Sequence, residues 1–346
     1  MVRRTSTGMM RIAIAGAGGF ATILAQQLSQ SAHALLVLST REHPEFEEYD
    51  CQVAVVNYHD VEDLRFTLQG VDLVISTISG PEQINLIDAA RRARVRRFVP
   101  SEFEGAISHR PTQTGTTAAA GGGSDGGGGG GSDPLDNGSS TARDLLQQWS
   151  QSRSFPMRST VFSCGVFYER FAPGGLQAYN MGTGTTGVGA TAAWRLQGQG
   201  SYLVDLGSGA GDIPAADARG RPVHLVLTSA FDVARYVAAA VEMGIDNWPA
   251  EFRVLGARLT TQGLVRVFEE VRGFHFQVNA RPYTEIVSWL QYFEENNEQE
   301  KWYFMQHLLQ TANGRYTFGN ANLNDMVDFQ PVGFREWLRE VWGQAQ

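Results

Sequence analysis

The sequence predicts an α/β fold: a parallel sheet flanked by helices, joined to a smaller, mainly helical domain. Two observations predict it. Short apolar runs alternate with helical patterns over the first 150 residues, and repeated β–α units form parallel sheets with right-handed crossovers. Helical periodicity predominates toward the C-terminus, at 232–241, 261–271, 284–312 and 333–342, with the 284–312 stretch broken.

The first strand and the turn after it carry the clearest motif. The apolar run 11–15 ends at a glycine cluster, and a helical stretch, 23–28, follows. Glycines let backbone N–H groups approach a dinucleotide pyrophosphate, and the helix N-terminus adds unpaired donors. The spacing fits both G-x-G-x-x-A and G-x-x-G-x-x-T, so we expect a Rossmann-type turn. Its candidate cofactor-binding residues are Gly16, Gly18, Gly19, Phe20 and Thr22.

The end of the second strand bears on the choice of cofactor. An NAD enzyme usually carries Asp or Glu there, which binds the ribose 2′-hydroxyl. Here the run 34–38 ends in Ser39-Thr40-Arg41. No carboxylate would repel a 2′-phosphate, and Arg41 can pair with it, so the sequence favours NADP(H). The alternative is that Arg41 is a solvated loop residue.

Three further strands are expected at 52–56, 71–78 and 95–103, with helices at 61–68, 83–93 and 141–150. Asp60 is the expected N-cap of the first of these helices. Ligands of such sheets bind beyond the carboxyl ends of the strands. The candidate cofactor residues at those ends are Asn57, Thr77, Ile78, Ser101 and Phe103.

Composition suggests how the chain divides. We expect a nucleotide-binding domain at 9–172 and a substrate-binding part at 173–346, with residues 223–241 returning to the first domain. Residues 112–140 contain six consecutive glycines and almost no apolar side chains, which predicts a flexible loop insertion. A tolerated insertion is favoured there over a lid.

Charge and composition limit the function classes. The net charge of −8 argues against nucleic-acid binding. No apolar run is long enough to span a membrane, and residues 1–10 lack the apolar core of a secretory signal. Two cysteines suit a reducing compartment, so we expect a cytoplasmic protein. The histidines are scattered, which predicts no metal site. The oligomeric state stays open.

Several motifs in order resemble one family. They are the glycine turn with Phe20, the GVDLVIST run at 70–77, the RFVPSEF run at 97–103, GVF at 165–167 and TSAFDVA at 228–234. Together they resemble the NmrA-like and isoflavone-reductase-like atypical short-chain dehydrogenases, especially fungal ones. The resemblance is strong over 11–104 and patchy over 141–240. It implies a Rossmann domain, a smaller substrate domain and, in general, NADPH.

The sequence departs from this family at two positions. Glu104 stands where members often have glycine. Reductases of the family usually carry a lysine near the nicotinamide, as general acid/base or ribose clamp, and Arg143 stands at the matching position. Arginine stays protonated, so Arg143 can clamp a ribose or stabilise an anion but transfers protons poorly. The resemblance therefore implies cofactor binding, with Arg143 among its residues, and leaves hydride transfer open.

Because Arg143 transfers protons poorly, a reduction would need another residue as proton donor. Glu102, at a strand's carboxyl end, and Tyr168 are candidate catalytic groups beside Arg143. Their alternatives are a structural carboxylate and a packed aromatic ring. The Tyr-x-x-x-Lys pair of short-chain dehydrogenases is absent from the sequence.

Two further stretches have competing interpretations. The glycine-rich run 204–212 imitates a methyltransferase motif, but two prolines and a glycine follow where a helix should begin, so a turn beside the strand at 223–227 is expected. The aromatic side chains between 289 and 304 could line a pocket or form a helix core.

Three functions fit these residues. The first is an NADPH-dependent reductase of an aromatic or alkaloid-like small molecule in secondary metabolism. The second is non-redox chemistry, such as a Pictet–Spengler-type cyclisation using Glu102, with NADP(H) as spectator. The third is a non-catalytic NADP redox sensor that binds a protein partner. The missing lysine favours the second and third, and the aromatic-rich later half favours a small-molecule substrate.

Overall fold

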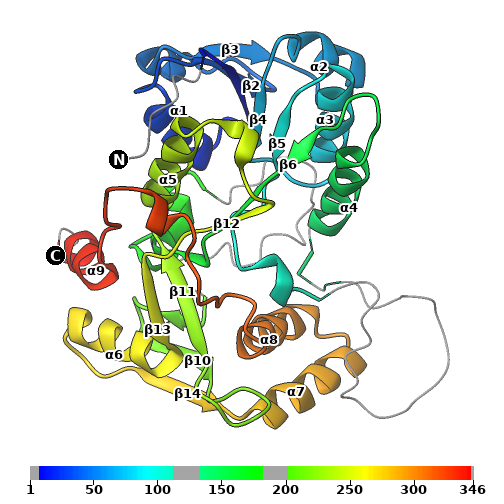
Figure 1. Cartoon of the computed structure of the whole chain (residues 1–346). Helices are drawn as coiled ribbons and strands as arrows, with labels where there is room; N and C mark the ends of the chain where they lie inside the picture. Colours follow the sequence, from blue (N-terminus) through cyan, green and yellow to red (C-terminus); the bar gives the residue numbers. More distant parts are fainter. Residues whose placement is uncertain (1–7, 112–132, 134, 137, 182–201, 344–346) are drawn as a thin grey trace.

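The computed structural model describes residues 8–111, 133, 135–136, 138–181 and 202–343. Its N-terminal part is a six-stranded parallel sheet in the order β3-β2-β1-β4-β5-β6 (Figure 1). This is the Rossmann order, which confirms the predicted fold class. The strands are β1 (Arg11–Ala15), β2 (Ala34–Ser39), β3 (Gln52–Val55), β4 (Leu73–Ser76), β5 (Arg97–Val99) and β6 (Arg158–Ser159).

Helices cover both faces of this sheet. Ile12 and Ile14 of β1 belong to one core with α1 (Gly19–Leu28) and α5 (Ala230–Glu242). Ala13 and Ala15, which point the other way, belong to a core with α2 (Val61–Thr67), α3 (Pro81–Arg92) and α4 (Ser139–Ser150). Strands buried on both faces explain the continuous apolar runs in the sequence. Asp60 caps α2 as expected, because its side chain accepts hydrogen bonds from the amides of Glu62 and Asp63.

The second part contains more strand than the sequence suggested. Two three-stranded sheets, β14-β10-β9 and β13-β11-β8, lie among its helices, so the part is mainly helical as expected but also contains strands that the sequence did not reveal. The strands are β8 (Val166–Phe167), β9 (Val204–Asp205), β10 (Ala210–Pro214), β11 (His224–Thr228), β13 (Ala257–Thr260) and β14 (Gln277–Arg281). The helices are α6 (Thr261–Arg272), α7 (Tyr283–Glu295), α8 (Gln299–Ala312) and α9 (Phe334–Gly343).

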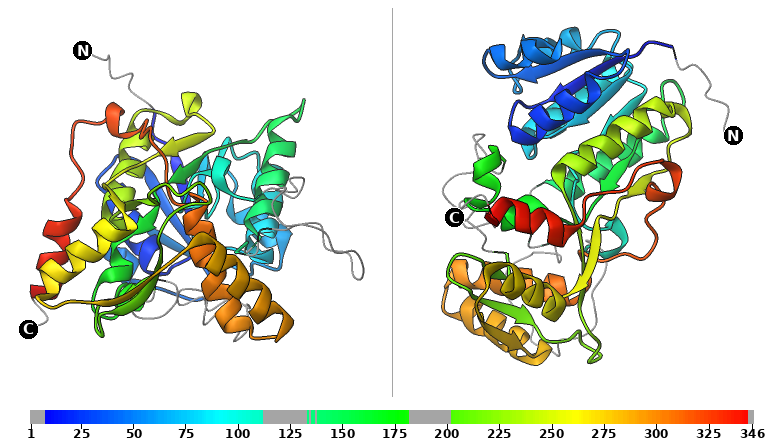
Figure 2. Two further views of the ribbon diagram at one scale, coloured as in Figure 1. Left: turned by 90° about the horizontal axis from the view of Figure 1, so that it is seen from below. Right: turned by 90° about the vertical axis from the view of Figure 1, so that its left-hand side faces the viewer.

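The chain crosses between the two parts more than once. The run 158–163 is divided between two sheets: β6 ends at Ser159, and β7 (Val161–Ser163) pairs instead with β12 (Glu251–Arg253). The run 204–212 lies in a hairpin of β9 and β10. On its other side β10 pairs with β14, and not with β11, the strand expected at 223–227. Figure 2 shows the parallel sheet and its helices at one end of the molecule and α7 and α8 at the other.

The glycine-rich segment lies largely outside the described residues. Asp133, Leu135, Asp136 and Gly138 are described before α4, which begins at Ser139. Among the residues with a described structure, no helix is long and apolar enough to cross a membrane.

Candidate cofactor and active site

The turn after β1 requires glycine at its first position. Gly16 has a φ of 101°, a region that favours glycine. A Cβ there would lie 2.4 Å from Thr77 Oγ1. Thr77 Oγ1 itself donates to the carbonyl of Ala15 at 2.8 Å, so the threonine is fixed against the turn. Ile78 packs at the same place, 3.1 Å from the position of that Cβ.

Tyr58 holds the turn from the other side and was not predicted. Its hydroxyl accepts a hydrogen bond from the Gly16 amide at 3.0 Å and donates to the Leu38 carbonyl at 2.8 Å. Burial raises the pKa of Tyr58, so the phenol stays protonated as this geometry requires. Its position beside Asn57, after a strand, was the signal that could have identified it.

The N-terminus of α1 follows the turn. Gly18 is the N-cap and supplies no side-chain acceptor to the first-turn amides of the helix. The Gly19 amide donates to the carbonyl of Asn180 at 2.9 Å. A Cβ at Gly19 would lie 1.7 Å from the Tyr179 carbonyl oxygen. The backbone at 179–180 therefore lies directly against the helix N-terminus.

Phe20 and Thr22 occupy the first turn of α1. The Phe20 ring packs edge-on against Phe103 at 4.7 Å between centroids and against Phe167 at 5.4 Å. Thr22 Oγ1 donates back to the Gly18 carbonyl at 3.3 Å. This brings the turn after β1, the residues after β5 and the strand β8 to one place.

The ends of β2 and β3 carry exposed polar side chains. Arg41 is exposed, and its Nε lies 3.3 Å from Nε2 of His43, which in turn contacts Glu45 at 2.6 Å. Asn57 is exposed and closes a turn by accepting the His59 amide at 3.0 Å. Gly16 and the end of β2 are joined, because the Gly16 amide also donates to the Leu38 carbonyl at 2.9 Å.

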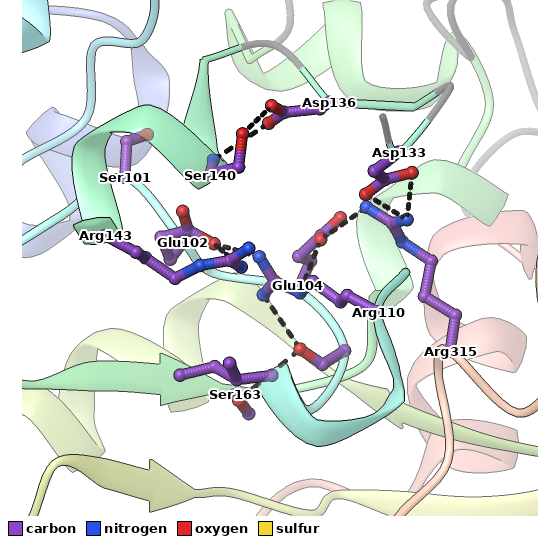
Figure 3. A network of polar contacts seen from close by, with 12 residues as sticks. Ser101, Glu102, Glu104, Arg110, Asp133, Asp136, Ser140, Arg143, Ser163 and Arg315 are labelled. Atoms are coloured by element: carbon purple, nitrogen blue, oxygen red, sulfur yellow. Dashed lines mark hydrogen bonds and ion pairs between the residues drawn. The ribbon is translucent and has the colours of Figure 1, made fainter. Parts of the chain in front are cut away.

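Glu102 and Arg143 meet beyond the end of β5 (Figure 3). The Glu102 carboxylate is fully buried and pairs with the buried Arg110, while Arg143 Nη1 of α4 lies 3.5 Å from Glu102 Oε2. Next to them, the Ser101 amide donates to Gln83 Oε1 at 2.7 Å. Glu102 is thus paired with two cations, which favours the structural-carboxylate interpretation.

Three buried polar atoms here lack a hydrogen-bond partner among the described residues: Glu102 Oε1, Arg110 Nε and Arg143 Nη1. A buried donor without an acceptor is costly unless a ligand completes it. Arg143 is therefore anchored by Glu102 and still has a donor available at the carboxyl edge of the sheet.

The pair belongs to a longer network of alternating charges. Glu104 Oε1 lies 3.0 Å from Arg110 Nε and 2.8 Å from Arg315 Nη2. Arg315 also forms an ion pair with Asp133, at 2.7 Å. Burial would raise the pKa of Glu104, but the charges of Arg110 and Arg315 outweigh it and lower that pKa. No sequence pattern indicated Arg110, Asp133 and Arg315, and only the unusual residue at 104 marked this site.

Tyr168 does not reach this site, which corrects its candidacy as a proton donor. Its ring is fully buried between Phe334 and Trp337, and its hydroxyl donates to the Val332 carbonyl at 3.1 Å. Burial also raises the pKa of the Tyr168 phenol. The packed-aromatic interpretation holds for Tyr168.

The aromatic cluster of α7 and α8 is divided between core and surface. Phe293 is buried, whereas Trp289 and Tyr292 are 38 % and 48 % exposed. In the described part of the chain, Trp289 stacks on Phe293 at 5.2 Å and so extends the helix core.

The turn fits a dinucleotide. Glycine at 16 and 18, a cap without a side chain and the N-terminus of a ten-residue helix form a cradle that a Cβ at Gly16 would disrupt. One backbone amide of this cradle, that of Gly19, already donates a hydrogen bond to the Asn180 carbonyl.

Comparison with known proteins supports nucleotide binding at this turn. Residues 16–120 match a protein family described as NAD(P)H-binding. Oxidoreductase swnR of Metarhizium robertsii is 31 % identical over 113 residues, which are 31 % of this chain and 37 % of that protein. Oxidoreductase swnR of Arthroderma benhamiae is 28 % identical over the same length. The chain thus spans about a third of the length of the curated relatives it matches.

Solved structures share the architecture of almost the whole chain. Isoflavone reductase is 15 % identical with a TM-score of 0.65, covering 96 % of this chain and 99 % of that one. AtPrR2 bound to NADP⁺ and (+)pinoresinol is 17 % identical with a TM-score of 0.63, covering 97 % and 99 %. Identity this low shows the fold alone. Residues 16–120 therefore form an NAD(P)H-binding domain, and the chain as a whole has the fold of isoflavone reductase.

Proposed function

We propose that the chain is an NADP(H)-dependent reductase of an aromatic small molecule, with Arg143 as the residue that polarises the group being reduced. The observation that carries this proposal is the buried Nη1 of Arg143, which has no hydrogen-bond partner in the described structure and is anchored 3.5 Å from Glu102. Bound NADPH would supply the hydride. The likeness of its fold to that of isoflavone reductase supports an aromatic substrate.

The residues of this chain have distinct tasks in the proposal. Gly16, Gly18 and the first turn of α1 would hold the pyrophosphate, and Arg41 would pair with a 2′-phosphate. A protonated arginine stabilises the oxyanion that develops on a carbonyl but does not release a proton at neutral pH. The proton would therefore come from water. Pairing of Glu102 with Arg110 removes the acid/base group that a cyclisation would need.

The test is NADPH consumption by the full chain with isoflavones and lignans as candidate substrates. We expect NADPH absorbance to fall as reduced product forms, and Arg143→Ala to lower kcat about 100-fold, the usual loss for one oxyanion donor. The NADPH dissociation constant of that variant should change far less. Arg153→Ala, at an exposed position just after α4, is the control.

Other outcomes would overturn the proposal. Product formed without loss of NADPH absorbance would indicate non-redox chemistry. NADPH binding without turnover of any candidate, together with recovery of a protein partner, would indicate a sensor. Full activity in Arg143→Ala would remove the assigned role of Arg143.

A further inference from the structure

A hollow lined by arginines lies on the edge of the sheet opposite the glycine turn. Its volume is about 530 Å³. Arg97 is the first residue of β5 and Arg158 the first of β6, so the hollow opens at the amino ends of these strands. Gly16 follows the carboxyl end of β1 in the same parallel sheet. The arginine hollow is therefore separate from the cofactor cradle.

Charge is unbalanced in this hollow. Five arginines line it, at 91, 94, 96, 97 and 158, and Asp246 is the carboxylate among the described lining residues. Arg96 pairs with Asp246 and, at 3.5 Å, with Asp72. In the described part of the chain, Arg94, Arg97 and Arg158 have no carboxylate within 4.0 Å. This concentration stands out in a protein whose net charge is −8.

Arg97 shows that the positive charge is built into the fold. It is 2 % exposed, yet its donors reach only neutral acceptors: Thr160 Oγ1 at 2.6 Å and the carbonyls of Trp248 and Asp246 at 3.4 Å. Burial, with repulsion from Arg158, lowers its pKa to about 10. Asp246 attracts this cation only from beyond ion-pair distance. A buried cation without a directly paired counter-charge is costly, and an anion in the hollow would offset that cost.

The two exposed arginines without a carboxylate partner among the described residues, Arg94 and Arg158, are positioned as well. Arg94 adopts a left-handed φ of 64° and lies over the Phe155 ring at 4.0 Å. Arg158 Nη1 donates to the Asp246 carbonyl at 2.8 Å. Arg91 lies in the last turn of α3, where the helix dipole alone explains a cation. The helix dipole does not explain Arg97 or Arg158, because each of these residues begins a strand.

We propose that this hollow binds a small molecule through its phosphate group. Guanidinium groups match phosphate oxygens in pairs, and a phosphate ester carries close to two negative charges at neutral pH. Three guanidiniums without carboxylate partners suit such a dianion better than a single carboxylate. The volume suits a small ligand, and Phe155 offers an aromatic surface beside Arg94.

Titration calorimetry with inorganic pyrophosphate tests the proposal on the full chain. The α1 turn can also bind this anion, so binding sites are counted as well as affinities. Arg94→Gln/Arg158→Gln is expected to lose one site, with affinity there at least about tenfold weaker, as loss of charge-assisted hydrogen bonds predicts. Arg65→Gln/Arg339→Gln removes two exposed surface charges elsewhere and should keep every site.

Equal numbers of sites and equal affinities in the two double variants would overturn the proposal. If Arg94→Gln/Arg158→Gln fails to fold, the single Arg158→Gln variant at its exposed position serves instead, with the same expected loss of one site. A wild-type chain that binds one pyrophosphate, lost completely on addition of NADPH, would also contradict a separate site.

Discussion

Gly16 is held in its conformation by both backbone geometry and contact. We expect Gly16→Ala to lower the free energy of unfolding by about 3 kcal/mol, because it combines left-handed strain with a Cβ 2.4 Å from Thr77 Oγ1. Dinucleotide affinity should fall with it. Urea unfolding and fluorescence titration with NADPH measure the two effects.

Gly220 provides the matched control. Its φ is 75°, but nothing lies within 4 Å of the position of an added Cβ. Gly220→Ala should therefore cost only the strain, about 1 kcal/mol, and leave nucleotide binding unchanged. Equal losses in the two variants would mean that the contact with Thr77 contributes nothing.

Arg41 carries the proposed preference for NADP(H). Its guanidinium is exposed at the end of β2, with the imidazole of His43 at 3.3 Å and no carboxylate pair within 4.0 Å among the described residues. We expect Arg41→Ala to raise the NADPH dissociation constant about tenfold or more, as a lost charge-assisted phosphate contact predicts, while that for NADH stays the same. An unchanged NADPH constant would move the 2′-phosphate elsewhere.

Among the elements, α5 depends on a carboxyl group that the sequence did not single out. Glu169 is fully buried and accepts hydrogen bonds from Ser229 Oγ at 2.7 Å and the Ala230 amide at 2.9 Å, at the helix N-terminus. Burial outweighs these bonds and raises its pKa to about 7. The folded chain thus holds this proton at a pH where the unfolded chain has released it.

This difference makes stability depend on pH. A raised pKa in the folded state means that wild-type stability falls as pH rises from the unfolded value of 4.5 toward about 7, by about 3 kcal/mol in total. Glu169→Gln should lack this component. Urea unfolding at about pH 5 and about pH 8 measures the difference, with Asp144→Asn, exposed on α4, as control. An identical pH slope in wild type and Glu169→Gln would contradict the assignment.

Element boundaries show what local sequence can predict. The strand expected at 34–38 and the helix expected at 261–271 agree with β2 and α6 to within a residue, because periodicity and caps are local. The strand expected at 71–78 pairs only over 73–76, since pairing ends where the neighbouring strands end. The break between β6 and β7 depends on β12, about ninety residues away, and no local pattern reveals it.

At the scale of the whole molecule, the candidate site also combines features that the local sequence predicts with features that depend on distant residues. The glycine turn and the strand ends could be predicted, because parallel strands bring their carboxyl ends to one edge. The ion network could not, since Glu104 and Arg315 are 211 residues apart in sequence. Glu102 lies beyond the end of β5 as expected, and its ion pair with Arg110, eight residues later, favours the structural interpretation of its carboxylate.

That network joins the two parts of the chain. Arg315 follows α8 and is buried, with ion pairs to Glu104, beyond β5, and to Asp133, before α4. Arg315→Met should therefore destabilise the fold by about 3–5 kcal/mol, because it leaves two carboxylates near each other without their shared cation. Arg339→Met, which breaks an exposed pair with Glu270, should cost no more than about 1 kcal/mol.

A double-mutant cycle separates this pairing from simple loss of packing. Arg315→Met and Glu104→Gln remove the two ends of one contact of 2.8 Å, so their effects on the free energy of unfolding should couple by about 1–3 kcal/mol. The pKa of Glu104 is lowered in the folded state, so its contribution is lost as pH falls through that lowered value. The coupling should accordingly shrink in acid. Additive effects at neutral pH would show that Arg315 acts through packing alone and that the two parts are not joined by charge.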